Sequence, residues 1–96
     1  MIASFGDYAT KALFHGTDGR RTRRIPADVR AVALRKLDML NAAARLMDLR
    51  SPPGNRLEAL KGDRKGMHSI RVNDQWRIVF RWDESDAHDV SIVDYH

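Results

Sequence analysis

The sequence has no cysteine, which removes several classes of site at once. Disulfides, thiolate zinc sites, iron–sulfur clusters and a cysteine nucleophile are all excluded. No apolar run approaches the ~18 residues that a membrane span needs, and the amino end lacks the basic and long apolar segments of a secretory signal. We therefore expect a soluble protein of the cytoplasm, with no membrane partner.

Sequence motifs for nucleotide hydrolysis and for metal binding are also missing. There is no Gly-rich phosphate loop followed by Lys-Ser or Lys-Thr, no Gly-x-Ser-x-Gly turn, and no pair of histidines at helical ligand spacing. The four histidines, at positions 15, 68, 88 and 96, are scattered along the chain. We therefore expect no metal and no cofactor, which leaves acid–base chemistry by Arg, Lys, Tyr and His.

The chain is short and its charge is unevenly distributed. Its 96 residues, 43% hydrophobic and 31% charged, predict one compact domain over residues 1–96. Residues 20–81 carry sixteen Lys and Arg against six Asp and Glu, whereas residues 82–96 carry five acids and no Lys or Arg. Thirteen of the seventeen cations are Arg, whose planar fork suits phosphate. This pattern indicates either a nucleic-acid partner or a well-solvated surface.

Two helices are predicted in the first half of the chain. Asp7 can cap a short helix over residues 8–14. A longer helix follows Pro26, and Ser51 with the two prolines after it must end that helix. Its apolar stripe recurs at threes and fours through Val29, Val32, Ala33, Leu37, Leu40, Ala44 and Met47. One face of this helix should therefore pack against a core.

The second half reads as an antiparallel meander. Strands are predicted at residues 68–72, 76–82 and 90–95, joined by turns short enough for hairpins. A further short strand is expected at residues 2–5. Together these elements predict an α+β sandwich, in which an N-terminal strand and helices pack on one face of a small antiparallel sheet.

Alternation along the middle strand separates its two faces. One face carries Trp76, Ile78, Phe80 and Trp82, and the other carries Arg77, Val79 and Arg81. We expect Trp76 to be buried under the helices and Arg77 to be exposed. With Lys61, Arg64 and Lys65 from the preceding loop, the exposed face would form a basic groove. Ordinary solvation of a hairpin sheet explains the same charges.

The last three residues bring a carboxylate, a phenol and an imidazole together as Asp94, Tyr95 and His96. Cleavage of RNA requires a base for the 2′-hydroxyl, cations for the charge that develops on phosphorus, and an acid for the leaving 5′-oxygen. An imidazole titrates near neutral pH, and a phenol does so where cations favour its anion. The alternative is that Tyr95 only packs its ring and His96 frays.

Four motifs occur in the order and spacing of one known family, over nearly the whole chain. They are the Ile2-x-Ser4-Phe5 opening, Arg56-Leu57-x-x-Leu60-Lys61-Gly62-Asp63-Arg64-x-Gly66, His68-Ser69-Ile70-Arg71-Val72 with Asn73-Asp74-Gln75-Trp76-Arg77-Ile78-Val79-Phe80, and Asp94-Tyr95-His96. The chain thereby resembles HigB-type toxins of the RelE/ParE superfamily, the plasmid maintenance system killer proteins of toxin–antitoxin pairs. Residues 49–55 are similar to the branch close to the slow-growth toxin GraT.

This resemblance implies an endoribonuclease that acts on the ribosome. Such an mRNA interferase enters the ribosomal A site and cuts translated mRNA there without metal, using the 2′-hydroxyl as nucleophile. Carried over by motif, Lys61 and Arg77 would stabilise the phosphorane, and Asp94, Tyr95 and His96 would supply orientation and proton transfer. The RNA-binding candidates implied in addition are Arg56, Arg64, Lys65 and Arg71. The implied partners are the ribosome with its mRNA, and a HigA-like helix-turn-helix antitoxin that alone would contact operator DNA.

One position departs from the family pattern. The family often has His-Pro between the two leucines before Lys61, where this chain has Glu58 and Ala59. Either Glu58 acts as a carboxylate base, or Tyr95 and His96 carry the acid–base work alone, or Glu58 is a solvated surface residue. The alternative function is therefore a ribosome-binding or nucleic-acid-binding growth regulator that cleaves weakly or not at all.

Overall fold

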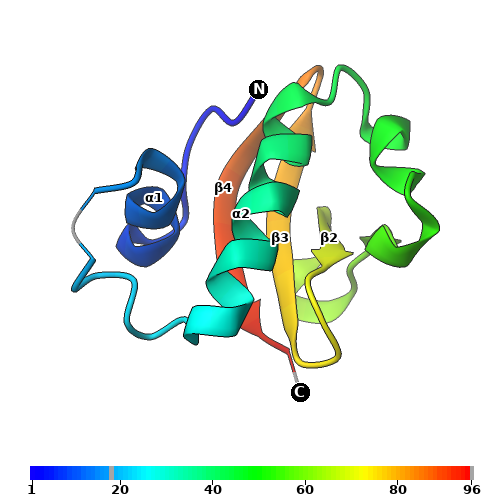
Figure 1. The fold of residues 1–96 in the computed structure, drawn as a ribbon. Helices are drawn as coiled ribbons and strands as arrows, with labels where there is room; N and C mark the ends of the chain where they lie inside the picture. Colours follow the sequence, from blue (N-terminus) through cyan, green and yellow to red (C-terminus); the bar gives the residue numbers. More distant parts are fainter. Residues whose placement is uncertain (18, 96) are drawn as a thin grey trace.

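Two helices pack on a four-stranded antiparallel sheet, which confirms the predicted α+β fold (Figure 1). This computed structural model describes residues 1–17 and 19–95. Its elements are α1 (Tyr8–His15), α2 (Ala27–Ala42), the 3-10 turns η1 (Leu46–Arg50), η2 (Pro53–Asn55) and η3 (Gly62–Arg64), and the strands β1 (Glu58–Ala59), β2 (Met67–Arg71), β3 (Trp76–Asp83) and β4 (Asp86–Asp94). The strands lie in the order β1-β2-β3-β4. Within the described ranges, no helix combines the length and the apolar composition that crossing a bilayer requires.

The core lies between α2 and the sheet, as the two sequence periodicities predict. Helix α2 buries residues from its apolar stripe, among them Ala33 and Leu37, which have no exposed surface. From β3 the side chains of Trp76, Ile78 and Phe80 meet this stripe, and Trp76 is only 7% exposed. The 3.6-residue period of the helix and the two-residue period of the strand thus present matching apolar faces.

The segment predicted as a first strand lies parallel to β4 along its edge. It forms isolated bridges from Ile2 to Ala87 and from Phe5 to Val90. The amide of Val90 donates to the Ser4 carbonyl over 3.1 Å, and the amide of Ala87 donates to the carbonyl of residue 1 over 2.9 Å. The expected strand therefore exists as an extended edge segment that is too irregular to form a continuous ladder.

Hydrogen bonds link the N-terminal cap of helix α1 to strand β4. Asp7 accepts a hydrogen bond from the Thr10 amide over 2.8 Å and pairs with Arg24 at 2.9 Å. Burial pushes the pKa of Asp7 upward, but the hydrogen bonds from Thr10 and Arg24 outweigh it and hold the pKa below its usual 3.8. The buried Thr10 hydroxyl then accepts from the Ile92 amide over 3.0 Å. The predicted cap therefore also positions the helix against the sheet.

Helix α2 ends earlier than its apolar pattern predicts. The helix stops at Ala42, and the last two residues of the expected stripe, Ala44 and Met47, are exposed. The cause is Asp48, whose Oδ2 accepts from the Ala44 and Arg45 amides at 3.0 Å each. These two hydrogen bonds also lower the pKa of the Asp48 carboxyl. A side chain that caps these amides starts a new turn, so the stripe prediction is wrong beyond Ala42.

The last hairpin is tighter than expected. Strand β4 begins at Asp86, because Glu84 turns the chain with φ 58° and lets Asp83 pair directly with Asp86. The polar stretch at residues 83–89, predicted as a loop, is therefore mostly strand. Its charged side chains are tolerated at an exposed hairpin tip. Strand β1 was not predicted, since its two residues are too few to show a pattern.

Candidate functional site

Strand register places four polar residues on the sheet face that points away from α2. Glu58 pairs with Ser69, and Arg71 pairs with Arg77. Directly paired residues point to the same side of a sheet, so Arg71 shares the face of Arg77, a point that the sequence left undecided. We call this face, defined by these four residues, the outer face. Arg81 also lies on the outer face, where its Nε forms an ion pair with Asp89 Oδ2 at 3.5 Å.

Arg77 is the most enclosed charge on the outer face. Its side chain is only 11% exposed, so the expectation that it is exposed is wrong, although the expected face is right. The guanidinium lies along the sheet, where Nε donates to Ser69 Oγ over 2.8 Å and Nη2 donates to the Arg56 carbonyl over 2.6 Å. Glu58 Oε2 is 3.9 Å from Nη2. These oxygens replace water, which is why a charged group lies so deep.

The carbonyl that holds Arg77 comes from a loop with its own buried anchor. Arg56 follows η2 with φ 44°, a left-handed conformation that directs the chain back toward the sheet. Next to it, the Asn55 side chain is fully buried, where it donates to a carbonyl of η1 and accepts from Lys36 Nζ. Burial lowers the pKa of Lys36, and the charges of Arg35 and Arg71 lower it further. The exposed Arg56 side chain remains available to a ligand.

Two guanidinium groups lie over the Tyr95 ring. Its ring centroid is 5.9 Å from Cζ of Arg77 and 6.0 Å from Cζ of Arg64, within the range of a cation–π contact. The residue is 41% exposed, so it is not packed away in the core. A backbone hydrogen bond from its amide to Gln75 holds the chain in place. The structure thus brings Tyr95, Arg64 and Arg77 together.

The other predicted cations lie at the ends of the η3 turn and at the end of β2. Lys61 is the N-cap residue of the η3 turn, and Arg64 is the last residue of that turn. The turn depends on Gly62, whose φ of 65° favours glycine. Lys61 and Lys65 are both exposed. Arg71 is engaged in an ion pair with Asp74.

Asp94, one of the predicted catalytic residues, is not brought into the cluster. Asp94 is the strand partner of Trp76, so its side chain lies on the opposite side of β4 from Tyr95, and it accepts from Gln75 Nε2 over 3.0 Å. His96 lies outside the described residues. Two groups that hold Arg77, the Ser69 hydroxyl and the Arg56 carbonyl, were not predicted from the sequence. Ser69 could have been singled out as a serine within the apolar part of β2. The Arg56 carbonyl could not, because every residue has a backbone oxygen and its role does not depend on the side chain.

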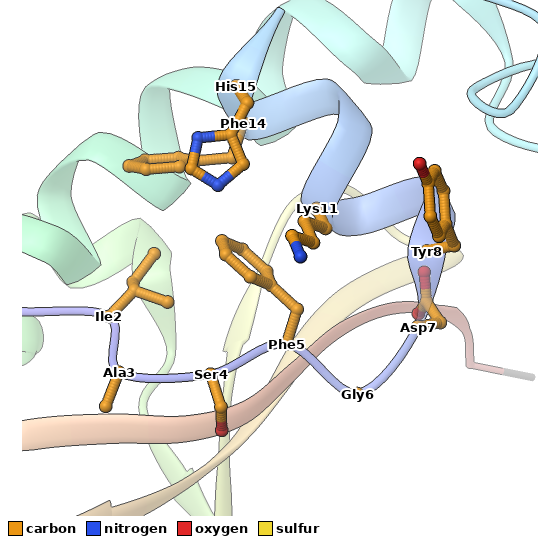
Figure 2. A pocket seen from close by; sticks show the side chains of 10 residues that line it. All are labelled: Ile2, Ala3, Ser4, Phe5, Gly6, Asp7, Tyr8, Lys11, Phe14 and His15. Carbon is orange, nitrogen blue, oxygen red and sulfur yellow. The ribbon is translucent and has the colours of Figure 1, made fainter. Parts of the chain in front are cut away.

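A pocket lies elsewhere, between the N-terminal segment and α1 (Figure 2). Its volume is about 670 Å³, and none of the predicted site residues lines it. The rings of Phe5, Phe14 and His15 lie 5.5–5.7 Å apart on its wall. The Lys11 amine points toward the Phe5 ring in the same view. Among residues 1–17 and 19–95, no three histidine or carboxylate side chains gather as metal ligands would.

Comparison with known proteins identifies the family. A profile described as "RelE-like toxin of type II toxin-antitoxin system HigB" matches residues 3–96. The chain belongs to the HigB-like toxin family. Toxin HigB-1 of Vibrio cholerae is 51% identical over 65 residues, which are 68% of each chain. Endoribonuclease HigB of Proteus vulgaris is 32% identical over 102 aligned residues that span both chains completely. Membership of a type II toxin–antitoxin family implies that this HigB-like toxin has an antitoxin partner.

Proposed function

We propose that this HigB-like toxin is an endoribonuclease that cuts translated mRNA in the ribosomal A site. The observation that carries the proposal is the enclosed Arg77, fixed by neutral oxygens and placed beside the exposed Tyr95 ring. A preorganised cation next to a proton-bearing group is the arrangement that phosphodiester cleavage by a 2′-hydroxyl requires. The name of the Proteus vulgaris relative, Endoribonuclease HigB, supports the same activity.

In the proposed reaction the 2′-hydroxyl oxygen attacks the adjacent phosphorus, and the 5′-oxygen leaves. The attacking hydroxyl gives its proton to a base, and the departing oxygen takes a proton from an acid, which leaves a 2′,3′-cyclic phosphate. Arg77 and Lys61 would stabilise the extra negative charge on the phosphorane. Tyr95 and His96 would carry the two protons. Asp94 would contribute to orientation from the other side of β4.

The proposed path of the RNA follows the cations around this centre. Arg56, Arg64, Lys65 and Arg71 would contact phosphates on either side of the scissile bond. We further propose that the protein acts in the cytoplasm and that its antitoxin is a HigA-like helix-turn-helix protein. Operator DNA would then be contacted only through that antitoxin.

Primer extension on mRNA in translating ribosomes tests the proposed activity. Replacing Arg77 with glutamine removes the charge and should lower the cleavage rate by roughly 100-fold or more, as loss of a transition-state donor does. Arg50→Gln is the matched control, since Arg50 is an exposed arginine of η1 outside the cluster. Ribosome-free RNA should remain uncut. Equal rates for wild type and Arg77→Gln, with both proteins folded by circular dichroism, would contradict the proposal.

A second candidate function rests on Glu58. It occupies the place of the family histidine and lies against the arginine that would bind phosphate. On this alternative the toxin binds the ribosome or RNA and restrains growth with little or no cleavage. Ribosome binding by the wild type without any codon-phased cut would favour this function. Binding accompanied by such cuts would exclude it.

A further inference from the structure

Ser69 is a buried polar residue in the middle of strand β2, a position that an apolar side chain could fill. It has no exposed surface, and its cross-strand partner on the outer face, Val79, is only 3% exposed. A buried hydroxyl without a hydrogen-bond partner destabilises a fold, whereas valine or alanine would fill this strand position without that requirement. Its oxygen has a partner here, the Nε–H of Arg77 at 2.8 Å.

Two of the three guanidinium nitrogens of Arg77, Nε and Nη2, donate hydrogen bonds within the described chain. A guanidinium has five N–H donors in a rigid plane. Nε donates to Ser69, and one Nη2 hydrogen reaches the Arg56 carbonyl at 2.6 Å. Within residues 1–17 and 19–95, Nη1 donates no hydrogen bond. These two hydrogen bonds, together with the covalent bond from Nε to Cδ, fix the plane of the guanidinium, so they also determine where the Nη1 donors point.

We propose that Ser69 is a positioning residue for Arg77. This inference rests on the proposed function, because it assigns to Ser69 the task of aiming the Nη1 donors of Arg77 at the scissile phosphate. Without the serine oxygen the guanidinium is held only at Nη2, and it can rotate about its terminal torsions. A catalytic group displaced by about 1 Å can lose roughly 100-fold in rate, so a hydroxyl that never touches RNA controls the reaction.

The cleavage test compares Ser69→Ala with a matched control on the same face. Ser91→Ala is the control, since Ser91 is the partner of Val79 on β4 and makes no hydrogen bond to Arg77. On ribosome-bound mRNA, Ser69→Ala should cleave between about 10-fold and 100-fold more slowly than the wild type at equal ribosome binding. The Ser91→Ala protein should match the wild type. A Ser69→Ala rate equal to that of the wild type overturns the inference.

A double variant separates positioning from a loss of fold. In an Arg77→Gln background there is no guanidinium to aim, so adding Ser69→Ala should change the residual rate by less than about twofold. If Ser69 instead supports only the strand, its removal lowers the rate by the same factor in both backgrounds. That second result, or a Ser69→Ala protein that no longer folds by circular dichroism in either background, overturns the inference.

A readout that does not depend on cleavage separates this inference from the proposed function. In nuclear magnetic resonance spectra, the Arg77 Nε proton should exchange slowly with water in the wild type and in Ser91→Ala. It should exchange rapidly in Ser69→Ala. If the wild type leaves mRNA uncut, the proposed function fails, and this exchange rate alone decides whether Ser69 holds Arg77. Equal exchange in wild type and Ser69→Ala overturns the inference whatever the nuclease assay shows.

Discussion

Replacing Glu58 with glutamine should strengthen RNA binding at the outer face. The carboxylate lies 3.9 Å from Arg77 Nη2, so a phosphate that approaches the guanidinium meets a negative charge already in place. The amide of glutamine keeps the size of the side chain and removes only that charge. Because the exchange is nearly isosteric, the fold and the position of β1 should be retained.

The size of the effect follows from the distance and the exposure of the pair. Two unit charges 3.9 Å apart attract by about 1 kcal/mol at the dielectric constant of water. Water is the appropriate medium, since the Glu58 side chain is 56% exposed and exposed pairs contribute at most roughly this amount. About 1 kcal/mol corresponds to about a fivefold lower Kd. The gain should shrink as salt is raised, because exposed charges are screened.

Fluorescence anisotropy with an RNA oligonucleotide that has 2′-deoxy sugars measures binding without cleavage. Asp63→Asn is the matched control, since Asp63 is an exposed acid in the neighbouring η3 turn. It changes the net charge equally and should alter the Kd by less than about twofold. Unchanged or weaker binding by Glu58→Gln, or an equal gain from Asp63→Asn, would refute the reasoning.

The same variant decides the role of Glu58 in cleavage. A general base contributes roughly 100-fold to 10,000-fold, so if Glu58 is the base, the glutamine variant binds RNA more tightly and cleaves far more slowly. If Glu58 is only a counter-charge to Arg77, cleavage at low toxin concentration rises together with binding.

Three further predictions concern the stability of the fold. Asp7→Ala should lower the free energy of unfolding at pH 7 by about 1–2 kcal/mol. Because the folded pKa of Asp7 lies below the unfolded value of 3.8, the charge-dependent part of this difference should be complete above pH 3.8 and be lost as the pH falls through the folded pKa. Thermal unfolding between pH 2 and 7 measures this loss. In urea unfolding, Leu37→Ala should lower the free energy of unfolding by about 2–5 kcal/mol, because Leu37 has no exposed surface. Met47→Ala should lower it by less than about 0.5 kcal/mol, because Met47 is 59% exposed. A large loss at Met47 would contradict the observed end of α2. His68→Phe should leave the free energy of unfolding unchanged or raise it by up to about 1 kcal/mol. The substitution keeps the stacking on Phe80 and removes a buried nitrogen, Nδ1, that has no hydrogen-bond partner in the described chain. A marked loss of stability in calorimetry would show that this nitrogen makes a hydrogen bond.

Much of the fold could be predicted from the sequence because it depends on local periodicity. The apolar stripe of α2 and the alternation of β3 determine which faces meet, and both were correct over most of their length. The predictions failed where a single residue decides the outcome. Asp48 ends α2 by capping two amides, and Glu84 closes the last hairpin with a positive φ. Neither effect changes the hydrophobic pattern from which the elements were predicted.

The candidate site was only partly predictable for a related reason. Residue type and alternation placed Arg77 on the correct face, and the motifs pointed to Tyr95 and Arg64. The depth of Arg77 depends on the Arg56 carbonyl, which a loop from elsewhere in the chain brings over the sheet. Burial of a charge by a distant backbone oxygen is a tertiary effect. Sequence alone therefore pointed to these three side chains as candidates, but it did not show how firmly Arg77 is held.

The way β4 is covered limits how a partner can bind. The amides of Ala87, Asp89, Val90 and Ile92 donate to residues 1 and 4 and to the Thr10 hydroxyl. A peptide that binds by extending a sheet needs such amides unpaired. At β4 it would first have to displace the N-terminal segment, and at the other edge β1 offers two residues. We therefore expect an antitoxin that meets the folded toxin to recognise side chains and surface shape rather than to add a strand at the β4 edge.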